Sequence, residues 1–460
     1  MLKGSCIYFF LMALAYTSLA QNPTFTINEA ALAAGQVTID ASGYNYNKGL
    51  LSLLPGVQVK SNSTNLTAAA PNTNTIPVTR FTAVAIKDGS IGTIVTLSTA
   101  NQIITNSGLL GLLNLGGGDF SVRYAASNLS SFPWQAGNYS TILAYSMTGL
   151  GLFTSLTPAS VTLSVNVPAF ITPLNEPGDI ELLVDNLNYF RTTQLSIDKA
   201  ISHRYTVPLL LSLKSNAAYF TFSNGHNGVT PPQINVNLVN ARITAPVQNP
   251  LISLSNTSQQ LYSGTVPAGN TTANTALFSI SSANLLTGFI NKGTYATTLN
   301  LEAKDASGIY PAATRNKTLN LKVTVNDLSE LAINTSTINL KYITAENYRN
   351  GVAADVVNHL VVSKTTPYDI TVKSDNANFT LGANTIPVSV LSIGPSNGQT
   401  GVNTINSLST QPQMLVNAGS PAIDRNISLR YFIPASKTVN LLNKQAGTYT
   451  TNVTYTLTAH

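Results

Sequence analysis

Histidines are the first residues to weigh, because a catalytic triad, a proton shuttle and most protein zinc sites need at least one of them. The chain has four, at His203, His226, His359 and His460. None stands at an HExxH or His-x-His spacing, and they do not occupy matching places in the repeats described below. The one Gly-x-Ser-x-Gly spacing, Gly394-Pro395-Ser396-Asn397-Gly398, lies in a cluster of turn-forming residues, and a catalytic triad there would still need one of these four histidines. The sequence therefore predicts no enzyme, no metal site and no cofactor.

Recurrent carboxylates offer a second kind of chemistry. Asp40, Asp198 and Asp355 lie 158 and 157 residues apart. Two interpretations are open: calcium held between domains by oxygen ligands, or turn-forming and backbone-accepting residues at strand ends. The clustered Asp and Asn motifs typical of calcium-bound adhesins are missing, which favours the structural interpretation. Whether calcium binds stays open at this point.

Exposed aromatic side chains would indicate a carbohydrate-binding face, since sugar rings stack on them. The tyrosines that are candidates for such a face are Tyr44, Tyr46, Tyr189, Tyr219 and Tyr348. Tyrosines in a β protein more often fill the core or pair across strands. A carbohydrate-binding protein is therefore the alternative rather than the leading interpretation.

The elements that would carry these residues are set by an internal repeat. A Gly-x-Tyr motif occurs at Gly137 and Tyr139, at Gly293 and Tyr295, and at Gly447 and Tyr449. The glycines are 156 and 154 residues apart, and each is followed by apolar and polar residues in alternation, which is the pattern of a half-buried strand. These six residues, with Asp40, Asp198 and Asp355, are predicted to be structural repeat positions.

Short alternating runs bounded by Gly, Pro, Asn and Ser clusters fill each copy, and long helical periodicity is absent. This pattern predicts an all-β chain of three tandem Ig-like, Greek-key β-sandwich repeats of about 155 residues. The expected divisions are a signal peptide at 1–20 and sandwiches at 21–172, 173–328 and 329–460.

Composition narrows the classes of partner. Only 9% of residues are charged, and the net charge of +6 comes from few carboxylates rather than from a basic patch. Nucleic-acid binding requires clustered phosphate contacts and is not expected.

The first twenty residues have the features of a secretory leader. Lys3 precedes an apolar run from Cys6 to Tyr16, and small residues follow at Ser18 and Ala20. The run is too short to span a bilayer, and no later stretch is long enough. Cys6 is the only cysteine, so the mature chain, which we expect to begin near Gln21, would have no thiol. The protein is predicted to be exported to the periplasm, the cell surface or the medium, without a transmembrane segment.

A strand that follows the Gly-x-Tyr strand in the first two copies has no counterpart in the last one. After the Gly-x-Tyr strand, copies one and two add an alternating strand, from Val161 to Val167 and from Thr318 to Val325, whereas the sequence ends at His460 before a third. If Ile27, Ile180 and Ile333 mark equivalent first strands, copy three has no closing strand. A neighbouring chain can fill such an edge by strand addition. The alternative is that the additional strands begin the following domain and nothing is missing.

The last Gly-x-Tyr strand, Ala446-Gly447-Thr448-Tyr449 through Thr458, resembles the C-terminal strand of bacterial spore-coat-U-like and fimbrial pilin-like secreted domains. It also resembles that of Gram-positive WxL cell-wall domains. The resemblance implies a bacterial surface or pilus-type protein. Two features depart from these families: the WxL tryptophans are absent, Trp134 being the only tryptophan, and pilin disulfides cannot form.

Together these observations favour a non-catalytic, secreted or cell-surface protein with a structural or adhesive role, for example as a fimbria-like subunit. Its expected partners are other surface proteins or copies of itself, and glycans under the carbohydrate-binding alternative. A hydrolase built on the sparse carboxylates is the least favoured of the three hypotheses.

Overall fold

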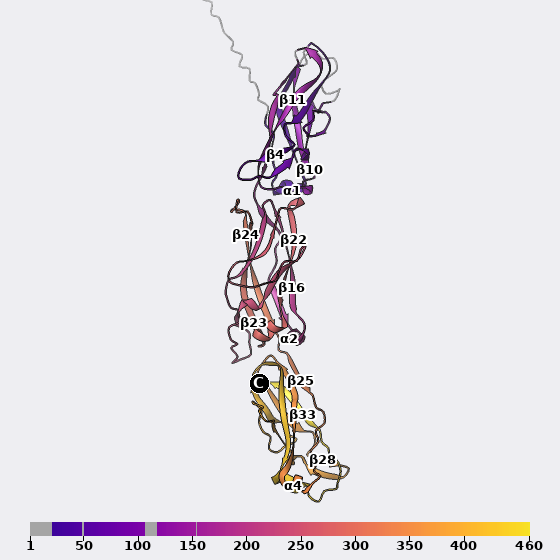
Figure 1. Cartoon of the computed structure of the whole chain (residues 1–460), viewed down its shortest axis with the longest axis vertical. Coiled ribbons are helices and arrows are strands. Elements are labelled where there is room, and N and C mark those ends of the chain that lie inside the picture. The colour runs from indigo at the N-terminus through magenta and orange to yellow at the C-terminus, as the bar shows by residue number, and fades with distance from the viewer. Residues whose placement is uncertain (1–20, 48–49, 106–116, 153) are drawn as a thin grey trace, which may run out of the picture.

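The described residues form mainly β-strands, in groups arranged end to end along one axis (Figure 1). The computed structural model describes residues 21–47, 50–105, 117–152 and 154–460. Strands pair only within three consecutive groups along the chain, and each group forms two main sheets. We call these groups the first, second and third sandwich. The all-β sandwich fold predicted from the alternating runs is confirmed.

The first sandwich packs two sheets around a core that contains Phe81, Trp134 and Tyr124. Its first sheet runs β1 (Thr24–Thr26), β13 (Ser160–Val167), β11 (Gly137–Leu152), β3 (Leu50–Ser61) and β9 (Gln102–Ile103), with β4 (Asn65–Ala68) and β5 (Thr75–Pro77) beside it. Its second sheet runs β12 (Ser155–Thr157), β2 (Gln36–Asn47), β10 (Gly117–Ser127), β6 (Phe81–Lys87) and β7 (Ser90–Ile91), with β8 (Val95–Thr96) on β6. The helical turns are α1 (Glu29–Ala34), η1 (Val78–Arg80) and η2 (Leu129–Ser131).

The second sandwich has the same plan. One sheet runs β14 (Ile171–Asn175), β16 (Leu195–Tyr205), β22 (Thr271–Ile280), β19 (Asn240–Ala245) and β20 (Ile252–Ser253). The other runs β15 (Ile180–Val184), β24 (Thr314–Val325), β23 (Gly293–Asp305), β17 (Leu209–Ser215) and β21 (Gln259–Gly264), with β18 (Thr221–Ser223) on β23. Residues of β23 alternate between buried and half-buried, as a strand with one core face requires. Its helical turns are α2 (Asn188–Arg191), α3 (Ser282–Gly288), η3 (Val236–Leu238) and η4 (Ala268–Asn270).

The third sandwich is smaller in its sheets. One sheet runs β25 (Ser329–Ile333), β26 (Gly351–Lys364), β32 (Ala422–Pro434) and β30 (Ser392–Pro395), and the other has β31 (Gln413–Gly419), β27 (Tyr368–Ser374) and β33 (Val453–Ala459). A separate hairpin joins β28 (Asn378–Leu381) to β29 (Asn384–Pro387). The helical turns are α4 (Ala345–Asn350), η5 (Val388–Val390) and η6 (Ala435–Leu441). Among the described residues its core cluster has 17 buried side chains, against 33 in the second sandwich, so this core is the least covered.

Hydrogen bonds and ion pairs hold neighbouring sandwiches in contact. Asn270 of the second sandwich is fully buried and bonds both the N–H and the carbonyl of Trp134 in the first. Arg191 of the second sandwich pairs with Glu330 and Asp424 of the third. Because neighbouring sandwiches contact each other directly, the molecule is a rod rather than three domains joined by flexible linkers.

Candidate functional site

The Gly-x-Tyr motif forms the same corner in all three sandwiches. The glycines have φ of +152°, +148° and +148°, a region that L side chains rarely adopt. Each tyrosine hydroxyl donates to the carbonyl four residues earlier: Tyr139 to Gln135 at 2.8 Å, Tyr295 to Asn291 at 3.0 Å, and Tyr449 to Gln445 at 3.0 Å. The motif therefore turns the chain into its strand and pins the turn through the tyrosine.

In the first two sandwiches, the strand after this corner pairs with a strand that follows it in the chain, which we call the closing strand. β11 pairs antiparallel with β13, where Gly137 lies opposite Val167 and Leu143 opposite Val161. β23 pairs antiparallel with β24, where Gly293 lies opposite Val325. The outer side of each closing strand is covered in turn by a short parallel strand, β1 on β13 and β15 on β24.

In the third sandwich β33 takes the place of β11 and β23, but no strand among the described residues takes the place of β13 and β24. β33 pairs with β27 alone, and it begins at Val453, six residues after Gly447, whereas β11 and β23 begin at their glycines. The residues that match β15 are 338–342, which belong to no strand. Within the described part of the chain, no strand covers this side of β33. We call β33, residues 447–452 and residues 338–342 the open edge.

Ile333 does not correspond to Ile180, as the conditional alignment of the sequence analysis assumed. Ile333 ends β25, which pairs with β26 as β14 pairs with β16. The counterpart of Ile180 is therefore Ile338, five residues after β25, as Ile180 is five residues after β14. The alternation of Ile338, Leu340 and Tyr342 repeats that of Ile180, Leu182 and Val184, and this signal was available in the sequence.

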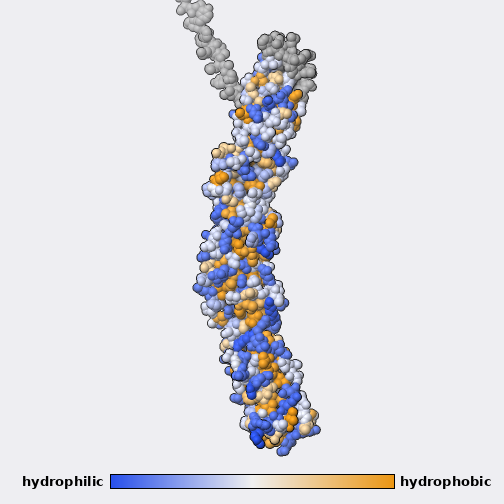
Figure 2. Space-filling model, in the orientation of Figure 1, coloured by the Kyte–Doolittle hydropathy of each residue, from blue (hydrophilic) through white to orange (hydrophobic). Residues whose placement is uncertain are grey.

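Side chains at the open edge are less buried than their counterparts. Tyr295 and Leu299 of β23 are fully buried, whereas the matching Tyr449 and Val453 are only half-buried. Ile338, Leu340, Tyr342, Tyr455 and Leu457 likewise pack against the core without being covered. β33 faces the viewer in Figure 1, and Figure 2 shows apolar residues along this part of the surface. Unpaired backbone and half-covered apolar side chains together are what an added strand would satisfy.

A buried polar network lies beneath the open edge. His359 of β26 is 2% exposed, and its Nε2 lies 2.8 Å from the Tyr431 hydroxyl. Tyr431 also hydrogen-bonds the hydroxyl of Tyr455 on β33. Nδ1 of His359 has no partner among the described residues. Burial lowers the pKa of His359 and raises the pKa of Tyr431 to about 12, so both side chains are neutral at pH 7.

The depressed pKa of His359 gives a pH dependence with a definite sign. The folded state holds the neutral imidazole, while in the unfolded chain it titrates at about 6.5. The stabilisation is therefore complete above the unfolded pKa and is lost as the pH falls below it. We expect the denaturation midpoint of the third sandwich to decrease as the pH is lowered from 7.5 to 5. In the His359→Gln variant this decrease should be smaller. Unfolding is monitored by tyrosine fluorescence or NMR. If the variant and the original protein lose stability equally as the pH is lowered, His359 is not the cause of the pH dependence.

The recurrent aspartates lie within strands rather than in turns. Asp40 of β2 pairs with Arg123 of β10 at 2.7 Å, and Asp355 of β26 pairs with Arg430 of β32 at 3.2 Å. Asp198 of β16 lies opposite Leu277. Hydrogen bonding to Arg123 lowers the pKa of Asp40. The three carboxylates lie in different sandwiches, and the described residues contain no group of three or more metal-ligating side chains.

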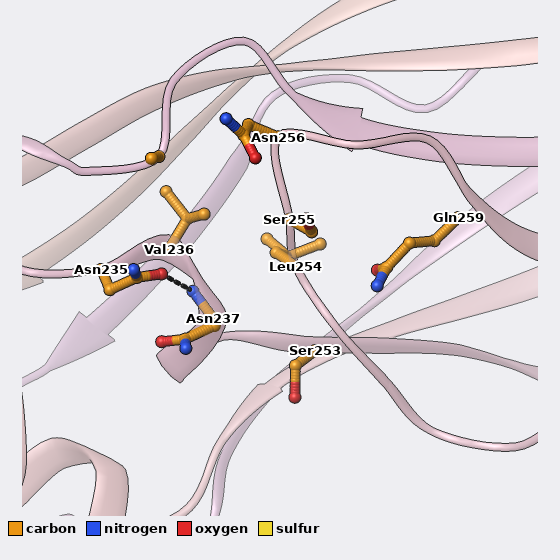
Figure 3. A pocket seen from close by; sticks show the side chains of 9 residues that line it. Asn235, Val236, Asn237, Ser253, Leu254, Ser255, Asn256 and Gln259 are labelled. Carbon is orange, nitrogen blue, oxygen red and sulfur yellow. Dashed lines mark hydrogen bonds between the residues drawn. The ribbon is translucent and has the colours of Figure 1, made fainter.

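The candidate tyrosines for a carbohydrate-binding face do not form one exposed surface. Tyr44 and Tyr46 are buried in the first sandwich, while Tyr219 of the second is 45% exposed. Near Tyr219 is a polar pocket of about 280 Å³, lined by Asn237, Ser253, Asn256 and Gln259 among others (Figure 3). No residue of its lining is titratable, so it offers hydrogen bonds but no acid–base chemistry.

The four histidines are likewise dispersed. His203 and His359 are buried in different sandwiches. His226 lies 3.1 Å from the carbonyl of His460, across the joint between the second and third sandwiches, and His460 Nδ1 lies 3.0 Å from Asp369 within the third sandwich. In the described ranges, no helix is long and apolar enough to cross a membrane.

Comparisons with known proteins give similarity in fold alone. No protein-family model matches the chain, and no curated protein sequence matches it. Among solved structures, a chain of the CsuC–CsuE chaperone–tip adhesion subunit pre-assembly complex of Acinetobacter baumannii archaic chaperone-usher Csu pili is 13% identical, with a TM-score of 0.31, over 61% of this chain and 97% of that one.

The CupB6 tip adhesin of Pseudomonas aeruginosa is 8% identical, with a TM-score of 0.28, over 63% of this chain and 90% of that one. Cadherin-like domains 1 to 4 of zebrafish RET are 9% identical, with a TM-score of 0.21, over 79% of this chain and 60% of that one. Because these scores are low, the functional proposal rests on the geometry of the chain itself.

Proposed function

We propose that this protein is a secreted, non-catalytic structural or adhesive surface protein, a fimbria-like subunit whose third sandwich accepts a strand from another chain. The observation that carries the proposal is the open edge, because β11 and β23 are closed at this place and β33 is not. The rod shape supports the proposal too, since a stiff array of sandwiches holds its two ends apart (Figure 1).

The first two sandwiches show what the accepted strand should look like. In β13 the core-facing residues are Val161, Leu163, Val165 and Val167, and in β24 they are Leu319, Leu321, Val323 and Val325. Both follow the pattern Val/Leu-x-Leu-x-Val-x-Val. Each such side chain contributes about 1.5–3 kcal/mol when fully buried. A strand of this pattern, antiparallel to β33, would place its last valine opposite Gly447.

Peptide complementation tests the proposal. The peptide of residues 160–167 is added to the chain from Gln21, and the thermal unfolding of the third sandwich is followed. A peptide that binds only the folded sandwich at 100 times its Kd should stabilise it by about 2.7 kcal/mol. The matched control is the same peptide with Leu163→Asn and Val165→Asn, which keeps the backbone donors but lacks the apolar pattern. No shift with the native peptide, or equal shifts with both, would contradict strand acceptance.

A further inference from the structure

The two joints between sandwiches share one hydrogen bond at their centre. The N–H of Ala136 donates to the carbonyl of Thr206 at 2.7 Å, and the N–H of Lys292 donates to the carbonyl of Thr365 at 2.8 Å. Each donor is the residue before the glycine of the Gly-x-Tyr corner. The corner of one sandwich is therefore also the docking point for the next.

The same threonines fix the chain segment that enters the next sandwich. Thr206 Oγ1 donates to the Pro168 carbonyl at 2.7 Å and accepts from the Phe170 N–H at 3.1 Å. Thr365 Oγ1 makes the corresponding bonds to the Asn326 carbonyl and the Leu328 N–H, both at 2.8 Å. Pro168 and Asn326 directly follow the closing strands β13 and β24. In each joint, the chain therefore passes directly from the closing strand of one sandwich into the next sandwich, which docks on the first.

The free end of the third sandwich reproduces the first sandwich's half of a joint. Gln445-Ala446-Gly447 matches Gln135-Ala136-Gly137. The Gln135 side chain accepts from Asn74 Nδ2 at 2.5 Å, and the Gln445 side chain accepts from Asn384 Nδ2 at the same distance. Ala136 is 2% exposed beneath the second sandwich, whereas Ala446 is exposed and no described residue accepts from its N–H.

Apolar side chains are exposed at this same end. Ile343, Val439 and Leu442 are 79%, 64% and 51% exposed. Ile343 precedes α4, and Val439 lies in η6, which is tied to α4 by a bond from Thr438 Oγ1 to the Tyr348 carbonyl at 2.7 Å. Figure 1 places α4 at the end of the rod farthest from the second sandwich. Exposed apolar residues around an unpaired N–H are consistent with a docking face.

We infer that the chain that supplies the strand also docks a sandwich of its own on the free end of the third sandwich. The docking face comprises Ala446, Ile343, Val439 and Leu442, and a threonine carbonyl of the partner accepts from the Ala446 N–H. This inference rests on the proposed strand acceptance. A strand antiparallel to β33 ends at Gly447, so its continuation emerges at this face, as Pro168 does after β13. The partner is thus a like domain, with an apolar alternating strand directly before it.

The experiment compares two probes of the same strand. One is the peptide of residues 160–167, and the other is residues 160–325, in which this strand precedes the second sandwich with Thr206. The buried core of the second sandwich comes entirely from residues 180–325, so the longer probe is expected to fold, which circular dichroism checks first. Affinities for the chain from Gln21 are measured by calorimetry. The longer probe should bind at least about tenfold more tightly, because docking adds a second contact to the strand.

Two variants of the full chain show whether the tighter binding of the longer probe depends on the docking face. Ala446→Arg should abolish the tenfold difference while leaving the peptide affinity unchanged, because the added side chain blocks the docking face and not β33. Val357→Arg is the control, since Val357 is 73% exposed on β26, outside the docking face. If both probes bind with equal affinity, or if the longer probe still binds more tightly to the Ala446→Arg variant, the partner does not dock on this face. Strand acceptance would not be affected by either result. Binding of neither probe would overturn strand acceptance and the joint together.

Discussion

Gly293→Ala is expected to destabilise the second sandwich by about 3–5 kcal/mol, combining backbone strain and overpacking. Gly293 has φ of +148°, and a Cβ there would lie 2.4 Å from a ring carbon of Phe222 and 3.0 Å from the Ser223 carbonyl. Phe222 packs in turn on Tyr295 of the same corner, with ring centroids 4.9 Å apart, so the ring has little freedom to withdraw. Chemical denaturation of the chain measures the loss.

The matched control for this change is Gly228→Ala. Gly228 has φ of +77° in the same sandwich, but a Cβ there would meet nothing within 4 Å. It therefore isolates the backbone strain, about 1 kcal/mol. If the two variants lose equal stability, the corner is not sterically closed and its glycine has no role beyond its φ.

Asn270→Ala is expected to uncouple the first two sandwiches. Its side chain accepts from the Trp134 N–H at 3.1 Å and donates to the carbonyls of Trp134 and Tyr205 at 2.7 and 2.9 Å. Truncation leaves the Trp134 N–H buried without an acceptor, which costs about 1–3 kcal/mol, and further bonds are lost. Small-angle scattering should show a more flexible particle, and the unfolding of the first sandwich should separate from that of the second.

Asn256→Ala is the control for this loss, because Asn256 is an exposed amide of the second sandwich, away from the joint. Scattering curves that are unchanged in Asn270→Ala would show that the joint does not depend on this residue.

The sequence was informative where a residue's role is local. The alternation after each Gly-x-Tyr corner predicted strands with one buried face. β11 and β23 have such a face, whereas the core-facing residues of β33 are only half-buried. The division into three copies at 21–172, 173–328 and 329–460 stays a prediction, as does the structural role of the nine repeat positions.

Contacts between distant segments were not predictable from one sequence. The ion pair of Asp40 with Arg123 joins residues 83 apart, so the aspartate was taken for a turn residue. Asn270 and Trp134 are 136 apart, and neither belongs to the repeat. The network of His359, Tyr431 and Tyr455 depends on three strands meeting at one edge. That copy three has no closing strand stays a prediction, which the order of strands along the chain suggests.

Amide hydrogen exchange on the chain from Gln21 tests the central claim most directly. The account predicts rapid exchange for those amides of residues 447–457 that are bonded neither to β27 nor to Thr380, while the matching amides of β23, covered by β24, are protected. Adding the peptide of residues 160–167 should slow exchange at those amides and leave β23 unchanged. Slow exchange along the open edge without peptide, or no protection with it, would contradict the claim that the third sandwich accepts a strand.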